Sequence, residues 1–156
     1  MVDGYVWYNN TWKSLGLRLF PGQAFTGFIQ TNSTYSVTGT VINQNYSGTN
    51  YNSTVVRTVD PVDVTDFSLM TVEFEITACY DNTRFGVRYG LSPTALGLTN
   101  ANPAAEWTVA LPAVGQFLGV RPRQIVNIDI SSVTGEMFMV LISAFATIRT
   151  YSIVLS

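Results

Sequence analysis

Residues 72–78, with the sequence VEFEITA, alternate apolar and polar side chains with a period of two. Successive side chains of a β-strand point to opposite faces, so this stretch would bury one apolar face and turn Glu73 and Glu75 to the other. Residues 81–83 (DNT) are typical of a turn, and residues 85–91 (FGVRYGL) read as a second strand. Together these segments predict a β-hairpin.

Similar strand patterns recur along the chain. They cover residues 24–30, 36–42, 54–59, 125–130, 137–144 and 147–155, with Phe145 and Ala146 as a short corner. Only residues 101–106 (ANPAAE) could form a turn of helix. About nine or ten short strands joined by polar turns, with long connections between some of them, predict an all-β fold. We expect an antiparallel β-sandwich of jelly-roll type, formed as a single domain by residues 1–156.

The strand at residues 137–142 is apolar on both faces. Met137, Met139 and Leu141 point one way and Phe138, Val140 and Ile142 the other. A strand of this kind needs cover on both faces. Either a large loop of this chain or a second subunit could provide that cover.

The composition limits the partners of the chain. Its 156 residues include 8 basic and 10 acidic side chains, and only 12% of the residues are charged. A nucleic-acid partner is not expected, because binding a duplex requires clustered Lys and Arg. The longest apolar run is too short to insert into a membrane. The abrupt start in a strand suggests a domain taken from a longer chain, and low charge with many Ser, Thr and Asn is common in extracellular and virion β-proteins.

The usual catalytic groups are rare in this sequence. There is no histidine, and Cys79 is the single cysteine, which leaves no Ser-His-Asp or Cys-His arrangement. No phosphate-binding loop and no cofactor or metal motif is found, so we expect no cofactor and no enzymatic activity. Glu73 and Glu75 share a strand face, as the acids of a jelly-roll glycoside hydrolase would, but acids on a solvated strand face are the commoner case.

Two acidic segments read as turns. Residues 60–66 (DPVDVTD) space three aspartates by three residues, and either a calcium loop or a solvated connection fits them. Asp129 is expected to cap the next turn through Ser131 or Ser132.

Residues 43–53 (NQNYSGTNYNS) contain no aliphatic residue. Tyrosines among Asn, Ser and Gly are typical of recognition loops, because rigid rings combine there with adaptable hydrogen-bonding groups. Tyr46, Tyr51, Asn45 and Asn50 are therefore candidate ligand-binding residues. A solvated loop whose tyrosines lean on the fold is the alternative.

Residues 5–13 (YVWYNNTWK) predict a hairpin with Asn9 and Asn10 in the turn. Trp7 would then face Trp12, and Tyr8 would face Thr11. Residues 1–20 could thus form a hairpin extension of the domain. The two indoles either pack against the domain or a neighbouring subunit, or form an exposed ligand platform.

Both ends of the chain resemble parts of bacteriophage tail and baseplate proteins. The opening YVWYNNTWKSL is similar to a short hairpin that recurs in those proteins, and VNIDISSVTGEMFMVLISAFATIRTYSIVLS is similar to the closing strands of their jelly-roll tip domains. The resemblance implies a structural or receptor-binding module on a phage particle, often trimeric and often in contact with host-surface glycans.

From these features we expect a non-enzymatic module of the virion, at the phage tail tip, that binds a host-surface receptor, carbohydrate in particular. Other virion proteins would be partners, and a homo-oligomer is expected, with a trimer favoured. The alternatives are a purely structural protein of the tail or capsid and a cellular carbohydrate-binding module.

Overall fold

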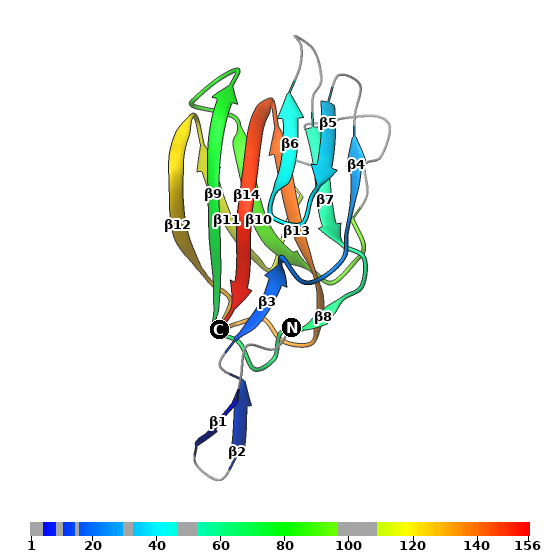
Figure 1. The fold of residues 1–156 in the computed structure, drawn as a ribbon, viewed down its shortest axis with the longest axis vertical. Coiled ribbons are helices and arrows are strands. Elements are labelled where there is room, and N and C mark those ends of the chain that lie inside the picture. Colours follow the sequence, from blue (N-terminus) through cyan, green and yellow to red (C-terminus); the bar gives the residue numbers. More distant parts are fainter. Residues whose placement is uncertain (1–4, 9–10, 15, 30–32, 47–52, 97–108) are drawn as a thin grey trace.

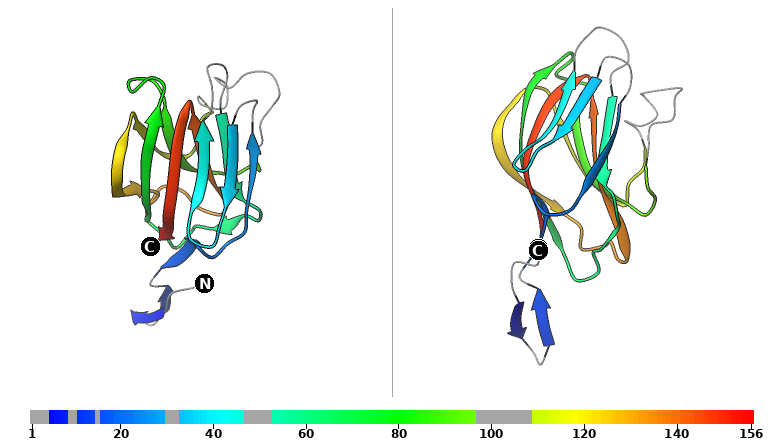
Figure 2. Two further views of the ribbon diagram at one scale, coloured as in Figure 1. Left: turned by 45° about the horizontal axis from the view of Figure 1, so that its top comes forward. Right: turned by 45° about the vertical axis from the view of Figure 1, so that its right-hand side comes forward.

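The structure, a computed structural model, describes residues 5–8, 11–14, 16–29, 33–46, 53–96 and 109–156. For residues 5–8 and 11–14 it describes the backbone. All regular structure in these ranges is β-strand: two six-stranded antiparallel sheets lie face to face, and β1 and β2 form a separate two-stranded sheet (Figures 1 and 2). The predicted antiparallel β-sandwich of jelly-roll type is confirmed. No helix long and apolar enough to span a membrane occurs in these ranges.

The first sheet, called sheet I, has the strand order β11-β10-β13-β7-β4, and β8 also pairs with β13. Its strands are β4 (Phe25–Ile29), β7 (Ser53–Thr58), β8 (Val62–Asp63), β10 (Gly86–Ser92), β11 (Ala113–Leu118) and β13 (Glu136–Ala144).

The second sheet, called sheet II, has the order β12-β9-β14-β6-β5, and β3 also pairs with β14. Its strands are β3 (Leu17–Phe20), β5 (Ser33–Val37), β6 (Ile42–Tyr46), β9 (Leu69–Cys79), β12 (Arg121–Asp129) and β14 (Ala146–Leu155).

The hairpin predicted from residues 72–78 and 85–91 is wrong, although both strands exist. β9 pairs with β12 and β14 in sheet II, whereas β10 pairs with β11 and β13 in sheet I. The turn between them therefore crosses from one sheet to the other. Alternation and turn residues indicate strands and turns, but the edges that pair are decided by strands distant in the sequence.

The strand predicted at residues 36–42 is also wrong, because it straddles a turn. The Thr38 backbone N–H and Thr38 Oγ1 both donate to the carbonyl oxygen of Val41, at 2.9 and 3.0 Å. This turn separates β5 from β6. As a result, residues 43–46 belong to a strand rather than to the predicted loop. The strands predicted at residues 24–30, 54–59, 125–130, 137–144 and 147–155 are confirmed with shifted ends. The helical turn predicted at residues 101–106 lies outside the described residues.

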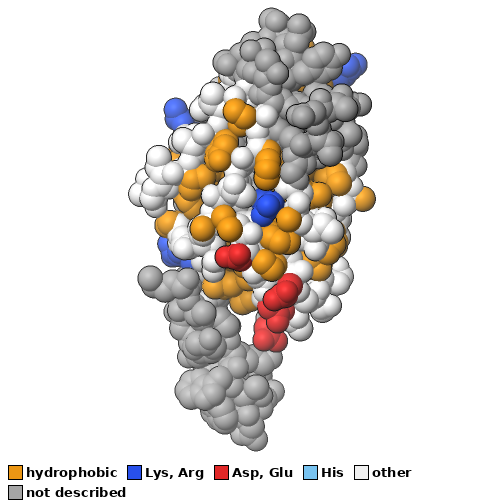
Figure 3. All heavy atoms as spheres, turned by 90° about the vertical axis from the view of Figure 1, so that its right-hand side faces the viewer, with side chains coloured by type: hydrophobic (Ala, Val, Ile, Leu, Met, Phe, Trp, Pro, Cys, Tyr) orange, Lys and Arg blue, Asp and Glu red, His pale blue; other side chains and the backbone are white. Residues whose placement is uncertain are grey.

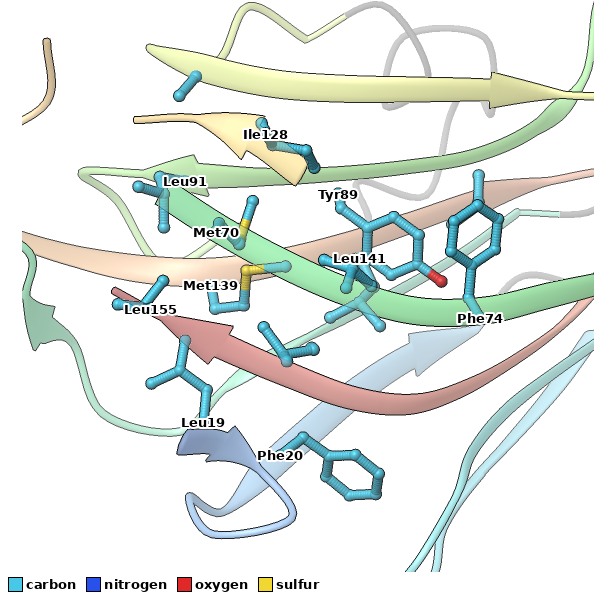
Figure 4. Packing of buried hydrophobic residues seen from close by; sticks show 14 of the residues in the cluster. Leu19, Phe20, Met70, Phe74, Tyr89, Leu91, Ile128, Met139, Leu141 and Leu155 are labelled. Carbon is cyan, nitrogen blue, oxygen red and sulfur yellow. The ribbon is translucent and has the colours of Figure 1, made fainter. Parts of the chain in front are cut away.

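The main core fills the space between the two sheets. Alternate residues of β9, β13 and β14 contribute to it, and Figure 4 shows Met70, Leu91, Met139 and Leu155 in this cluster. Tyr89 of sheet I and Thr150 of sheet II are both fully buried, and their hydroxyl oxygens lie 2.6 Å apart. A hydrogen bond therefore joins the sheets through the core.

A second apolar cluster lies on the outer face of sheet I and explains the two-faced strand. Val55, Val140 and Ile142 are buried there, and the residues packed against them are Leu96, Val109, Leu111 and Phe138. Leu96, Val109 and Leu111 come from the segment between β10 and β11. The loop alternative is confirmed for the described residues, so this face does not require a second subunit.

The N-terminal hairpin has the predicted register. β1 (Tyr5–Tyr8) pairs with β2 (Thr11–Ser14), with Trp7 opposite Trp12 and Tyr8 opposite Thr11. Figure 1 shows the hairpin beyond the end of the sandwich at which β14 finishes. The placement of the two indole side chains lies outside what the structure describes.

Candidate ligand-binding site

The outer face of sheet II carries a network of paired charges. Arg123 of β12 donates to Glu73 of β9 at 2.8 Å, and Arg149 of β14 donates to Glu75 at 3.0 Å. The hydroxyl of Tyr151 also donates to Glu75, at 2.7 Å. The Arg123 guanidinium lies 3.9 Å from the centre of the Tyr151 ring. One face of this ring is therefore already occupied by a side chain of the protein.

This network stabilises the charged form of Glu75. The Tyr151 hydroxyl is the main cause that lowers the pKa of Glu75, and the Arg149 guanidinium lowers it further. A general acid in a glycosidase needs a raised pKa. Glu73 and Glu75 do lie on the outer face, as predicted, where each accepts hydrogen bonds from neighbouring strands.

The acidic turns form the same local motif three times. In each, one carboxylate oxygen accepts from the backbone N–H and the hydroxyl of the Ser or Thr two residues later, as in Asp63 with Thr65, Asp81 with Thr83 and Asp129 with Ser131. The turn predicted at Asp129 is confirmed, with Ser131 as its partner. Within the described ranges no three metal-ligating side chains come together.

Four aromatic rings gather at one end of the sandwich. Tyr46 ends β6, Tyr80 follows β9, Phe85 precedes β10 and Phe145 is the corner between β13 and β14. Figure 1 shows these strand ends at the end of the molecule opposite the β1–β2 hairpin. We call these four residues the aromatic end.

Phe145 is the centre of the aromatic end. Its ring centre lies 4.4 Å from that of Phe85, and 6.2 Å from those of Tyr46 and Tyr80. These distances are in the range of favourable aromatic contacts. Tyr80 is the most open of the four, because 66% of its surface is exposed. A ring held by neighbours on one side and open to solvent on the other can stack on a ligand.

Polar groups close to the rings are mostly engaged within the protein. The Tyr46 N–H donates to Thr147 Oγ1 at 3.2 Å. The Cys79 thiol donates to the carbonyl oxygens of Asp81 and Phe85, and burial raises its pKa. The exposed Arg84 pairs with Asp81 at 3.5 Å. The Cys79 thiol is therefore a protonated structural group. The Arg84–Asp81 ion pair, in the turn between β9 and β10, is neutral overall.

The predicted binding residues are only partly brought together. Tyr46 belongs to the aromatic end, but Asn45 precedes it in β6 and points to the opposite face, where its amide donates to Thr34 Oγ1 at 3.3 Å. Alternation along a strand separates the two side chains. Asn50 and Tyr51 lie outside the described residues, and so do the side chains of Trp7 and Trp12.

Phe145, Phe85 and Tyr80 were not predicted as site residues. Each lies in a connection between β-strands that belong to different sheets, so sequence proximity does not reveal their meeting. The sequence feature that could have revealed them is the presence of aromatic residues in two tight connections, residues 80–85 and Phe145. A short corner usually favours glycine, and a phenylalanine there is unusual.

Apolar side chains are also exposed at the side where β4 and β5 are the edge strands. Figure 3 shows hydrophobic groups over this side of the molecule around a basic group. Ile29 and Val37 are exposed there, at 52% and 38%. These aliphatic side chains lack the flat face of an aromatic ring, and so this side is a weaker candidate for ligand stacking.

Comparisons with known proteins bear on the fold. No protein-family model and no curated protein matches the chain. Among solved structures, the family 11 carbohydrate-binding module from Clostridium thermocellum, in complex with a β-1,3-1,4-mixed-linked tetrasaccharide, has 13% identity and a TM-score of 0.50, with 90% of this chain and 93% of that chain covered. The low-affinity xylan-binding module CBM86 from Roseburia intestinalis has 12% identity and a TM-score of 0.46, with coverage of 85% and 95%. At such identities the likeness to the first structure shows a shared sandwich fold alone.

Proposed function

We propose that this chain is a non-catalytic module that binds a neutral carbohydrate at its aromatic end. The observation that carries the proposal is the exposed ring of Tyr80 beside the Phe145 ring. A sugar ring presents C–H groups on one face, which stack on an aromatic ring, and hydroxyl groups at its rim. Tyr80 offers an open ring, whereas the Tyr151 ring on the outer face of sheet II is covered by Arg123.

The charge distribution favours an uncharged ligand. Residues 19–56, which include β4, β5 and β6, contain no Asp, Glu, Lys or Arg. In the neighbouring turn, Asp81 and Arg84 pair with one another. An acidic polysaccharide would find no unpaired cluster of basic side chains among the described residues of this end, whereas a neutral one needs only hydroxyl and amide partners.

The shared fold is consistent with this role. The Clostridium thermocellum module is a protein of similar architecture whose structure contains a bound tetrasaccharide. This supports the proposal for the class of ligand, while the position of the site in this chain rests on its own aromatic residues.

We also propose a biological setting, a module of a phage tail that attaches to host-surface polysaccharide. The support is the resemblance of the two ends of the sequence to tail and baseplate proteins. The aromatic end lies opposite the β1–β2 hairpin, so the hairpin could contact other virion proteins while the rings face the host (Figure 1). The homo-oligomer remains a prediction, with the trimer favoured by the resemblance alone, and the apolar strand β13, which suggested a second subunit, is covered by this chain.

Electrophoresis of the native protein in gels that contain soluble polysaccharide tests the proposed ligand class. Mixed-linkage glucan, xylan and galactomannan are the neutral probes, and alginate is the acidic probe. We expect retardation by at least one neutral probe and none by alginate. Tyr80→Ala should weaken binding about tenfold or more, because a lost stacking contact of about 1.4 kcal/mol changes a dissociation constant tenfold.

Tyr151→Ala is the matched control, since it removes a tyrosine side chain from the outer face of sheet II. It should bind like the wild type. Equal retardation of the wild type and Tyr80→Ala would contradict the location of the site. Retardation by alginate alone would contradict the proposed neutral ligand and indicate an acidic polysaccharide instead. Retardation by no probe would contradict carbohydrate binding and favour the structural alternative.

A further inference from the structure

The corner between β13 and β14 is a single residue, Phe145. β13 ends at Ala144 in sheet I, and β14 begins at Ala146 in sheet II, so the chain changes sheets within one residue. Phe145 has a φ of 48° and is the only non-glycine residue with a positive φ among the described residues. Residues with a side chain rarely adopt this left-handed conformation, whereas glycine adopts it freely.

The Phe145 side chain connects elements of both sheets. Its ring contacts Phe85, which leads into β10 of sheet I. It also contacts Tyr46, the last residue of β6, and Tyr80, which follows β9, both in sheet II. Its carbonyl oxygen accepts a hydrogen bond of 2.9 Å from the N–H of Tyr80. Both the ring and the backbone of Phe145 therefore hold Tyr80 in place.

A strained conformation is retained where the surrounding structure or the function requires it. A glycine at position 145 would form the corner without strain but would leave Phe85, Tyr46 and Tyr80 without their common neighbour. The Phe145 ring therefore supplies contacts to these three rings that the turn itself does not require.

We propose that Phe145 is the positioning residue of the aromatic end, which fixes the direction of the Tyr80 ring for stacking on a sugar. This inference rests on the proposed function. Phe145 is itself only partly exposed, and its effect on a ligand is exerted through Tyr80. The rigid arrangement lowers the cost of ordering Tyr80 on binding, which is the benefit of a preorganised site.

Three variants of Phe145 test the inference, with two readouts each. The first readout is affinity for the best neutral polysaccharide, and the second is the set of tyrosine ring resonances in NMR spectra. Phe145→Leu removes the ring and keeps the strained backbone. Phe145→Gly removes the ring and also relieves the backbone strain. Phe145→Tyr keeps an aromatic ring. We expect Phe145→Leu and Phe145→Gly to bind at least tenfold more weakly than the wild type. In both variants the Tyr80 and Tyr46 resonances should be displaced and the Tyr151 resonances unchanged. Phe145→Tyr should bind like the wild type.

The outcomes separate this inference from the proposed function. Wild-type affinity in a folded Phe145→Leu or Phe145→Gly variant would overturn it, and so would unmoved Tyr80 resonances. Weaker binding by Phe145→Tyr would also overturn it, because this variant keeps an aromatic ring at position 145. Displaced Tyr80 resonances in a protein whose wild type binds no neutral polysaccharide would support the positioning of Tyr80 and refute the proposed function instead.

Discussion

The hydrogen bond between Tyr89 and Thr150 gives a sharp prediction about the core. The two hydroxyl oxygens are 2.6 Å apart, both residues are fully buried, and they belong to opposite sheets. Tyr89→Phe removes one hydroxyl and leaves that of Thr150 buried without a partner. Leaving a buried polar group unsatisfied costs about 1–3 kcal/mol. Thr150→Val creates the converse defect with a side chain of the same shape.

The double variant distinguishes a mutual partnership from two independent packing effects. Since Tyr89→Phe with Thr150→Val removes both hydroxyls, we expect it to lie within about 1 kcal/mol of the wild type, although each single change costs about 2 kcal/mol. For a chain of this size, about 2 kcal/mol corresponds to a fall in Tm of about 4–8 °C. Guanidinium unfolding at pH 7 measures all four proteins. Additive losses in the double variant would show that neither hydroxyl depends on the other and would contradict a hydrogen bond between Tyr89 and Thr150.

Three further predictions concern stability. Burial raises the pKa of Tyr89 above its usual value of about 10. The contribution of neutral, buried Tyr89 to stability should therefore be constant below about pH 10 and be lost as the pH rises further, and Tyr89→Phe should flatten this fall in unfolding midpoints measured from pH 8 to 11. Hydrogen bonds from Thr65, Thr83 and Ser131 lower the pKa values of Asp63, Asp81 and Asp129. The stabilisation from these three charged aspartates should therefore be present above about pH 4 and be lost as the pH falls below it. An unchanged unfolding midpoint from pH 6 to 2.5 would contradict this. A Cβ on Gly86 would overlap the carbonyl oxygen of Phe117, whereas one on Gly39 would meet nothing within 4 Å. Gly86→Ala should therefore lower stability by about 1–3 kcal/mol, while Gly39→Ala raises it by about 0.4–1 kcal/mol, and equal unfolding midpoints would refute the close approach at Gly86.

The sequence predicted the strands better than their pairing. The alternation at residues 72–78 correctly indicated a half-buried strand, and its acids do face outward. Its hairpin partner was wrong because β9 and β10 each pair with strands from other parts of the chain. A period of two is a local property, whereas the sheet to which a strand belongs depends on contacts far apart in sequence.

The apolar strand β13 shows how far composition can lead. Two apolar faces correctly required two covers, but a loop and a subunit were equally consistent with the pattern. The cover by Leu96, Val109 and Leu111 comes from a segment remote from β13, and its placement depends on the three-dimensional fold.

The candidate site was predicted at one residue of its four. Tyr46 was identified because it lies in a segment of tyrosines among Asn, Ser and Gly. Asn45 beside it faces the other side of sheet II, because residues 43–46 form a strand and not a loop. Phe85, Tyr80 and Phe145 meet through two corners that cross between the sheets, and no spacing rule in the sequence relates these positions.

An NMR titration tests whether carbohydrate binds at the aromatic end. Uniformly labelled protein would be titrated with an oligosaccharide of the neutral polysaccharide that retards it most. We expect the resonances of Tyr46, Tyr80, Phe85 and Phe145 to shift and those of Arg123, Ile125 and Tyr151 to stay unchanged. Shifts confined to Arg123, Ile125 and Tyr151 would place the ligand on the outer face of sheet II and contradict binding at the aromatic end.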